Sequence, residues 1–120
     1  MRILVCEDDY MVSNAIRHKL LKENYEVVSV TNGNEAIAEM TKQDFDLVIT
    51  DLLMPFKGGL ELIYEIKHKL NKNLPIIVLS TLGNEDTIIE SFKLGANDYI
   101  RKPFSPNELI IRVQKLLLNL

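Results

Sequence analysis

Five short apolar runs alternate along this chain with longer segments that carry apolar residues at helical spacing. Most of the runs are rich in valine and isoleucine, as strands buried on both faces are. We expect strands at Arg2–Cys6, Glu26–Val30, Leu47–Thr50, Ile76–Ser80 and Asp98–Ile100. Because parallel strands joined by helices need right-handed crossovers, the alternation predicts an α/β fold of (βα)5 type, a doubly wound five-stranded parallel sheet in the order 2-1-3-4-5.

Size and charge narrow the class of protein. The chain has 120 residues, 47 % of them hydrophobic, which suits one core, and we expect a single domain over residues 1–120. The net charge of −3 and the lack of a clustered basic face argue against direct contact with nucleic acid. We find no signal peptide and no apolar stretch of membrane-spanning length, so we expect no membrane contact. The single cysteine, Cys6, lies within an apolar run and is expected to be a buried thiol and not half of a disulfide, which agrees with a cytoplasmic protein.

Turn and cap residues mark the expected starts of the helices. The start signals are Asn32-Gly33-Asn34, Gly58-Gly59, Asn84 and Ser105-Pro106. The turn after the first strand is different, because the acidic run Glu7-Asp8-Asp9 stands where dinucleotide-binding folds carry a glycine-rich loop. A dinucleotide fold is therefore disfavoured.

Polar side chains follow four of the apolar runs, at the edge where parallel strands end. They are Glu7 and Asp8, Asp51, Ser80 and Lys102. Open α/β sheets place their chemistry at this edge, and carboxylates gathered there repel one another unless a cation compensates them. Oxygen ligands of this number favour Mg²⁺, which leaves room for phosphate oxygens, whereas zinc would need nearby cysteine or histidine.

Taken singly, each of these residues has an ordinary structural explanation. Asp8 or Asp9 would serve as a helix N-cap at any strand-to-helix turn. Lys102 precedes Pro103, and this pair is common in surface turns, although a cis bond there would aim the lysine inward. Only the convergence of several groups on one edge favours a functional site.

Four segments in this order and spacing resemble the receiver domain of two-component response regulators. They are Ile3–Asp9, Asp46–Pro55, Leu79-Ser80 and Gly95–Phe104. The resemblance spans the whole chain and implies the flavodoxin-like receiver fold and a phosphoaspartate switch. The phosphoryl donor would be a phosphohistidine on a histidine kinase or phosphotransfer protein.

The same resemblance implies which residues form the acidic site. Asp51 is expected to be the phosphoryl acceptor and a Mg²⁺ ligand, and Asp8 a direct Mg²⁺ ligand. Glu7 would act largely through metal-bound water, and the Leu53 carbonyl would add a backbone ligand. Phosphoryl transfer depends mostly on positioning and charge neutralisation, which such a set supplies.

Further positions carry over to phosphoryl binding and switching. Lys102 and the Ser80 hydroxyl would bind phosphoryl oxygens, and Thr81 occupies the small-residue position beside them. Ser80 and Tyr99 form the expected switch pair, which would reshape the face made by helix 4, strand 5 and helix 5. That face could support a homodimer, with apolar residues Ile88, Ile89, Phe92, Ile110, Ile111 and Leu118 as candidates.

Departures from the family pattern leave alternatives open. Gly58 stands where the family often has Asp, which removes a possible side-chain cap of the third helix. Leu53 and Leu82 are apolar at positions where receivers with short-lived phosphorylation often carry polar groups. Asn97 replaces an acidic residue that many winged-helix regulators use in dimer salt bridges. A phosphohydrolase with an aspartate nucleophile is one alternative, although Leu53 stands where its acid/base aspartate is needed. A pseudo-receiver that binds partners without phosphate is another.

Overall fold

The computed structural model describes residues 1–118 and contains one parallel sheet in the order β2-β1-β3-β4-β5, as predicted. The strands are β1 (Arg2–Cys6), β2 (Glu26–Val30), β3 (Leu47–Thr50), β4 (Ile76–Ser80) and β5 (Asp98–Arg101). The first four match the expected bounds. β5 extends one residue beyond the predicted end because Arg101 pairs with Ser80 of β4.

Helices follow each strand. They are α1 (Tyr10–Lys22), α2 (Gly33–Lys42), α3 (Gly59–Tyr64) with the π-helical turn η1 (Glu65–Lys69), α4 (Glu85–Leu94) and α5 (Pro106–Leu117). The side chains of Asp9, Asn32, Asn84 and Ser105 each accept N-terminal backbone N–H groups, so these polar residues end the preceding loops as caps. Gly58 precedes α3 without a side-chain cap.

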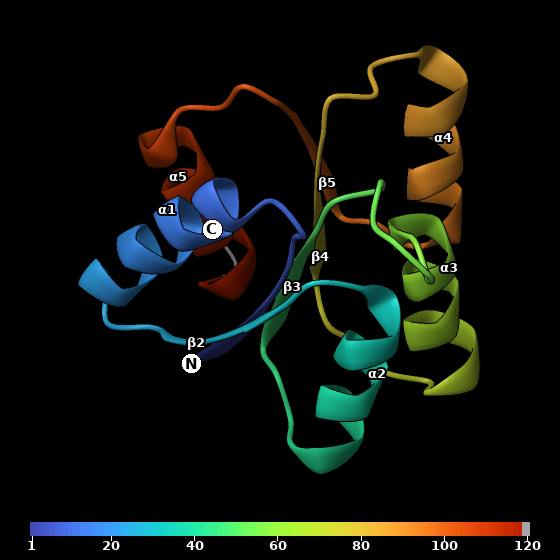
Figure 1. Cartoon of the computed structure of the whole chain (residues 1–120), viewed down its shortest axis with the longest axis horizontal. Helices are drawn as coiled ribbons and strands as arrows, with labels where there is room; N and C mark the ends of the chain where they lie inside the picture. Colours follow the sequence, from blue (N-terminus) through green and yellow to red (C-terminus); the bar gives the residue numbers. More distant parts are fainter. Residues whose placement is uncertain (119–120) are drawn as a thin grey trace.

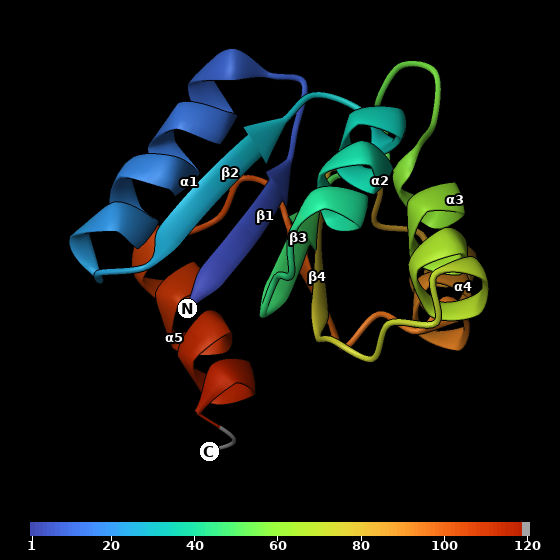
Figure 2. The same ribbon diagram turned by 90° about the horizontal axis from the view of Figure 1, so that it is seen from below.

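The helices cover both faces of the sheet (Figure 1): α1 and α5 lie on one side, and α2, α3 and α4 on the other. Alternate residues of each strand supply the two cores, as in β1, where Ile3 and Val5 pack toward α1 and α5 while Leu4 and Cys6 pack toward α2 and α3. In Figure 2 the arrowheads of β1 and β2 point to the same edge, where the loops to α1 and α2 begin. Side chains that follow the strands are therefore gathered there.

Part of the expected apolar surface on α4 and α5 is exposed. Ile89, Phe92, Ile111 and Leu118 are exposed, Ile88 is half-buried, and Ile110 is buried against the sheet. Ile110 was wrongly included because it adjoins Ile111, and the helical turn directs these neighbours to different sides. None of the helices in residues 1–118 has the length and apolar character needed to cross a membrane.

Candidate functional site

Three carboxylates meet at the carboxyl edge of the sheet. Cys6 and Thr50 pair directly in adjacent strands, so Glu7 and Asp51, the next residues of each chain segment, become neighbours. Glu7, Asp8 and Asp51 can each offer an oxygen such that the three oxygens lie within 4.8 Å of one another. Glu7 is only 3 % exposed and Asp51 8 %, whereas Asp8 is exposed to solvent. Such a cluster could hold a metal ion.

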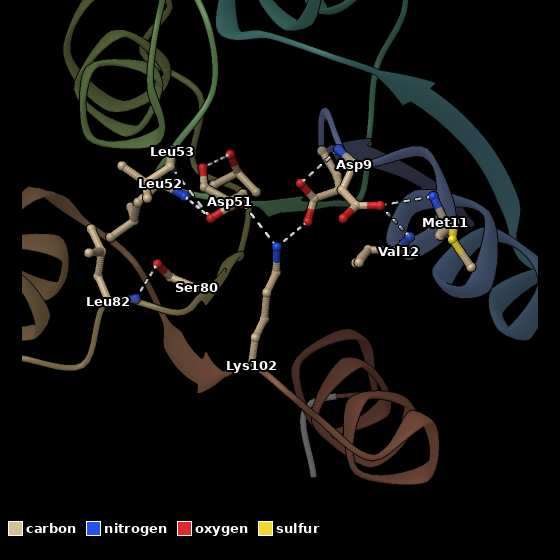
Figure 3. A network of polar contacts seen from close by, with 11 residues as sticks. Asp9, Met11, Val12, Asp51, Leu52, Leu53, Ser80, Leu82 and Lys102 are labelled. Atoms are coloured by element: carbon tan, nitrogen blue, oxygen red, sulfur yellow. Dashed lines mark hydrogen bonds and ion pairs between the residues drawn. The ribbon is translucent and has the colours of Figure 1, made fainter.

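Lys102 follows β5 and reaches this cluster across the sheet, because β5 lies two strands from β3, the strand that precedes Asp51. Its Nζ lies 2.9 Å from Asp51 Oδ2 and also forms an ion pair with Glu7 Oε1. Figure 3 shows the extended side chain directed toward Asp51. The Lys102–Pro103 peptide bond is cis, and Lys102 N donates to Ser80 O at 2.9 Å. The lysine is therefore part of the acidic site, not of a surface turn.

Burial and charge shift the pKa values of this pair. Burial raises the pKa of Glu7 above its usual value of 4.5, and the Asp51 charge adds to the rise, which the Lys102 hydrogen bond only partly offsets. Burial works to lower the pKa of Lys102, but its hydrogen bonds to Glu7 and Asp51 outweigh burial and leave that pKa raised. Lys102 therefore stays protonated and neutralises part of the cluster.

Backbone N–H groups orient the other side of the Asp51 carboxylate. Asp51 Oδ1 accepts from Leu52 N at 2.7 Å and from Leu53 N at 3.3 Å. The Leu53 side chain, by contrast, is 56 % exposed at the rim. Position 59 requires glycine, because a Cβ atom there would lie 2.2 Å from the Asp51 carbonyl oxygen. The loop that follows β3 thus sets the direction of the carboxylate.

The two expected switch residues share one backbone partner. The fully buried Ser80 accepts from Leu82 N through its Oγ at 3.0 Å, and the half-buried Tyr99 donates its hydroxyl hydrogen to the Leu82 carbonyl. In Figure 3 the Ser80 hydroxyl is directed toward Leu82. Thr81 is exposed beside them. Sequence reasoning missed this link, because a contact through backbone atoms leaves no signal in residue types.

Two further features were not predicted. Arg112 of α5 donates to both carboxylate oxygens of Asp98 in β5 at 2.8 Å, which ties these elements together. A groove of about 580 Å³ runs between α1 and the start of α5 and reaches Lys102 and Thr81. Its apolar lining includes Met11, Val12, Phe104 and Leu109.

Comparison with known families agrees with this architecture. Residues 3–114 match the model of the response regulator receiver domain. The transcriptional regulatory protein ResD of Bacillus subtilis is 40 % identical over 116 residues, which are 97 % of this chain and 48 % of that protein. The transcriptional regulatory protein RprY of Bacteroides fragilis is 37 % identical over 117 residues, 98 % of this chain and 49 % of that protein. The chain thus spans about half the length of these relatives.

Solved structures lead to the same family. The receiver domain of the Francisella response regulator 1452 superposes with a TM-score of 0.91 at 35 % identity. The match covers 98 % of this chain and 97 % of that domain's chain. The BeF3-activated N-terminal receiver domain of Klebsiella pneumoniae RstA gives a TM-score of 0.90 at 31 % identity, with 98 % of each chain covered. Fold, acidic edge and sequence relatives together show that the chain belongs to the family of response regulator receiver domains.

Proposed function

We propose that Asp51 accepts a phosphoryl group from a phosphohistidine, carried by a histidine kinase or phosphotransfer protein in the cytoplasm. The observation that carries this proposal is the pairing of Asp51 with Lys102 at 2.9 Å inside a carboxylate cluster. A nucleophilic carboxylate flanked by an ammonium and by acidic metal ligands suits the transfer of a highly charged group. The phosphoaspartate then changes the conformation of the domain.

The donor set fits Mg²⁺, and we assign its ligands by residue. Asp8, Asp51 and the Leu53 carbonyl would hold the ion directly, while Glu7 would contribute through water. These are hard oxygen donors in a small number, as Mg²⁺ prefers when phosphate oxygens complete its shell. When bound, the ion supplies positive charge to the phosphoryl oxygens and lowers the repulsion between donor and acceptor.

The remaining contributions come from the chain itself. The Leu52 and Leu53 N–H groups hold Asp51 Oδ1, so Oδ2 on the Lys102 side is the candidate attacking atom. As the bond between Asp51 Oδ2 and phosphorus forms, the P–N bond to the donor histidine breaks and the imidazole leaves with its electron pair. Lys102 would move from Oδ2 to a phosphoryl oxygen, and its charge favours that product. Thr81 and Ser80 lie on the adjacent strand end and would donate hydroxyl hydrogens to the phosphoryl group.

Switching follows from the shared backbone partner of Ser80 and Tyr99. If the Ser80 side chain rotates toward the phosphoryl group, its Oγ moves away from Leu82 N and the hydrogen bond between them weakens. Movement of Leu82 displaces the carbonyl that anchors the Tyr99 hydroxyl, and so changes the α4–β5–α5 face. This face carries the exposed Phe92 and Ile111 and would support a homodimer or another partner.

The output is proposed from the relatives. ResD and RprY are named as transcriptional regulatory proteins and are about twice as long as the matched region. We propose that this receiver controls an attached or separate output domain and makes no DNA contact itself, in keeping with its net charge of −3. Phosphohydrolase turnover is disfavoured by Leu53, and a phosphate-independent role is disfavoured by the complete acidic site.

Labelling of the acceptor tests the proposed function. The wild-type chain, incubated with a small phosphodonor and Mg²⁺, should gain one phosphoryl group that maps to Asp51. Asp51→Asn should abolish the labelling, while Asp44→Asn, which alters a carboxylate with 97 % exposure, should label as the wild type does. Equal labelling of wild type and Asp51→Asn would refute the assignment, and failure of the wild type to bind beryllofluoride with Mg²⁺ would favour the pseudo-receiver.

A further inference from the structure

The loop between β3 and α3 contains an unfavourable turn close to the acceptor. Lys57 N donates to Pro55 O at 2.8 Å, which closes a three-residue turn around Phe56. Phe56 has φ of +66° and an exposed side chain, although bulky residues avoid the left-handed region. A turn of this kind persists only where its surroundings hold it in place.

Lys57 supplies three such contacts. Its carbonyl accepts from Gly33 N at 3.0 Å, at the start of α2. Its methylene groups cross Gly33 so closely that a Cβ atom there would lie 2.6 Å from Lys57 Cγ. Its ammonium forms an ion pair with Glu65, the first residue of the π-helical turn after α3. In Figure 2 the green loop before α3 lies beside the start of α2.

The Lys57–Glu65 pair differs from the surface ion pairs of this chain. Its side chains are 17 % and 18 % exposed, compared with 33 % and 97 % for the Lys72–Asp44 pair. Water screens a partly buried pair less, so its geometry is better defined than that of an exposed pair. Lys57 thus joins the loop to α2 and α3 at once.

The same loop carries the groups that direct the acceptor. Leu52 N and Leu53 N donate hydrogen bonds to Asp51 Oδ1. Gly59 N donates to Leu52 O at 3.0 Å, and this hydrogen bond closes the loop where α3 begins. Mg²⁺ demands near-ideal ligand geometry, so a loop that is already ordered binds it without further loss of backbone freedom. Disorder at Lys57 would therefore loosen the orientation of the Asp51 carboxylate and of the Leu53 backbone.

We propose that Lys57 and Glu65 are positioning residues that hold the β3–α3 loop in the conformation that aims the Asp51 carboxylate and offers the Leu53 carbonyl to Mg²⁺. The proposal rests on the proposed function for its metal ion. Lys57 and Glu65 contact neither the ion nor the phosphoryl group, and they act through the backbone of residues 52–59.

The test compares Lys57→Met, which keeps the methylene packing on Gly33 but removes the charge, with the conservative Lys57→Arg. We expect Lys57→Met to bind Mg²⁺ about tenfold more weakly in an NMR titration, equal to about 1.4 kcal/mol. In the metal-free protein, hydrogen exchange at the Lys57 and Gly59 amides should be about tenfold faster. Lys57→Arg should restore both values, and Glu65→Gln should resemble Lys57→Met.

Lys72→Met is the matched control, because it removes an ion pair at the opposite end of the sheet. It should leave Mg²⁺ affinity and the two amide exchange rates unchanged. An affinity in Lys57→Met equal to wild type, or an equal loss in Lys72→Met, overturns the positioning role while the proposed function stands. A wild-type chain that binds no Mg²⁺ overturns the positioning role together with the proposed metal site, and labelling of Asp51 then tests phosphoryl transfer separately.

Discussion

Lys102 Nζ lies 2.9 Å from Asp51 Oδ2, although the two residues are 51 positions apart in the sequence. The contact arises because β3 and β5 both pair with β4, so that their ends project over the same edge. It makes Lys102 the compensating charge for a cluster of carboxylates that would otherwise repel one another. The stability of the metal-free domain should therefore depend on this lysine.

Lys102→Met should destabilise the metal-free protein by about 2 kcal/mol, because Glu7 and Asp51 lose their buried partner. Mg²⁺ should then recover more stability in the variant than in wild type, since the ion replaces the missing charge. Urea unfolding with and without Mg²⁺ measures both effects. Lys42→Met, which removes a lysine with 70 % exposure, should change neither. A Lys102→Met variant as stable as wild type without metal would contradict this account.

Glu7 should give the metal-free protein a measurable pH dependence. Its folded pKa is raised above 4.5, so its contribution to stability is full below that value and is lost as pH rises through the higher folded pKa. Glu7→Gln removes this loss. As pH rises above 4.5, the free energy of unfolding of the variant should rise relative to wild type. Parallel pH profiles for the two proteins would show that Glu7 does not titrate as described.

Gly59→Ala should cost about 2 kcal/mol of unfolding free energy, because the new Cβ would lie 2.2 Å from the Asp51 carbonyl oxygen and the backbone must move. The adjacent Gly58→Ala is the control, since its Cβ would lie 3.0 Å from Leu52 O and demands less adjustment. Thermal unfolding and acceptor labelling should both rank Gly59→Ala below Gly58→Ala. Equal effects would mean that the close approach is relaxed easily.

The phosphorylated state should be long-lived, because in-line hydrolysis needs a held water and Leu53 and Leu82 offer it no polar anchor. Leu53 is 56 % exposed at the rim, so a polar replacement there can reach solvent and the site without disturbing the core. Leu53→Asn with Leu82→Glu should speed loss of phosphate about tenfold, or about 1.4 kcal/mol of barrier. Unchanged decay with intact Mg²⁺ binding would leave the lifetime to Thr81 and backbone groups.

Activation should tighten self-association through α4, β5 and α5, where Ile89, Phe92 and Ile111 are exposed. Sedimentation with beryllofluoride and Mg²⁺ should give a larger mass than sedimentation without them. Phe92→Ser should reduce that increase, whereas Tyr64→Ser, an exposed aromatic on α3, should not. An unchanged mass at high concentration in both states would exclude self-association as the response.

The sequence was sufficient for the strands, their order and most helix starts. The run Ile76–Leu79 is apolar at every position because both faces of a parallel strand are covered, and this pattern can be recognised in the sequence itself. Asn84 and Ser105 likewise mark helix starts through local hydrogen bonds. The candidate site residues could be named because parallel strands bring their carboxyl ends to one edge.

Tertiary structure alone decided which side chains meet and how. The Ser80–Leu82–Tyr99 connection runs through backbone atoms, and the Lys57–Glu65 pair joins a loop to a π-helical turn. Ile110 is buried and Ile111 exposed by the rotation of α5 against the sheet. Periodicity and caps depend on neighbours along the chain, which the sequence records, whereas these contacts depend on loop conformation and helix rotation, which are settled only when the whole core packs.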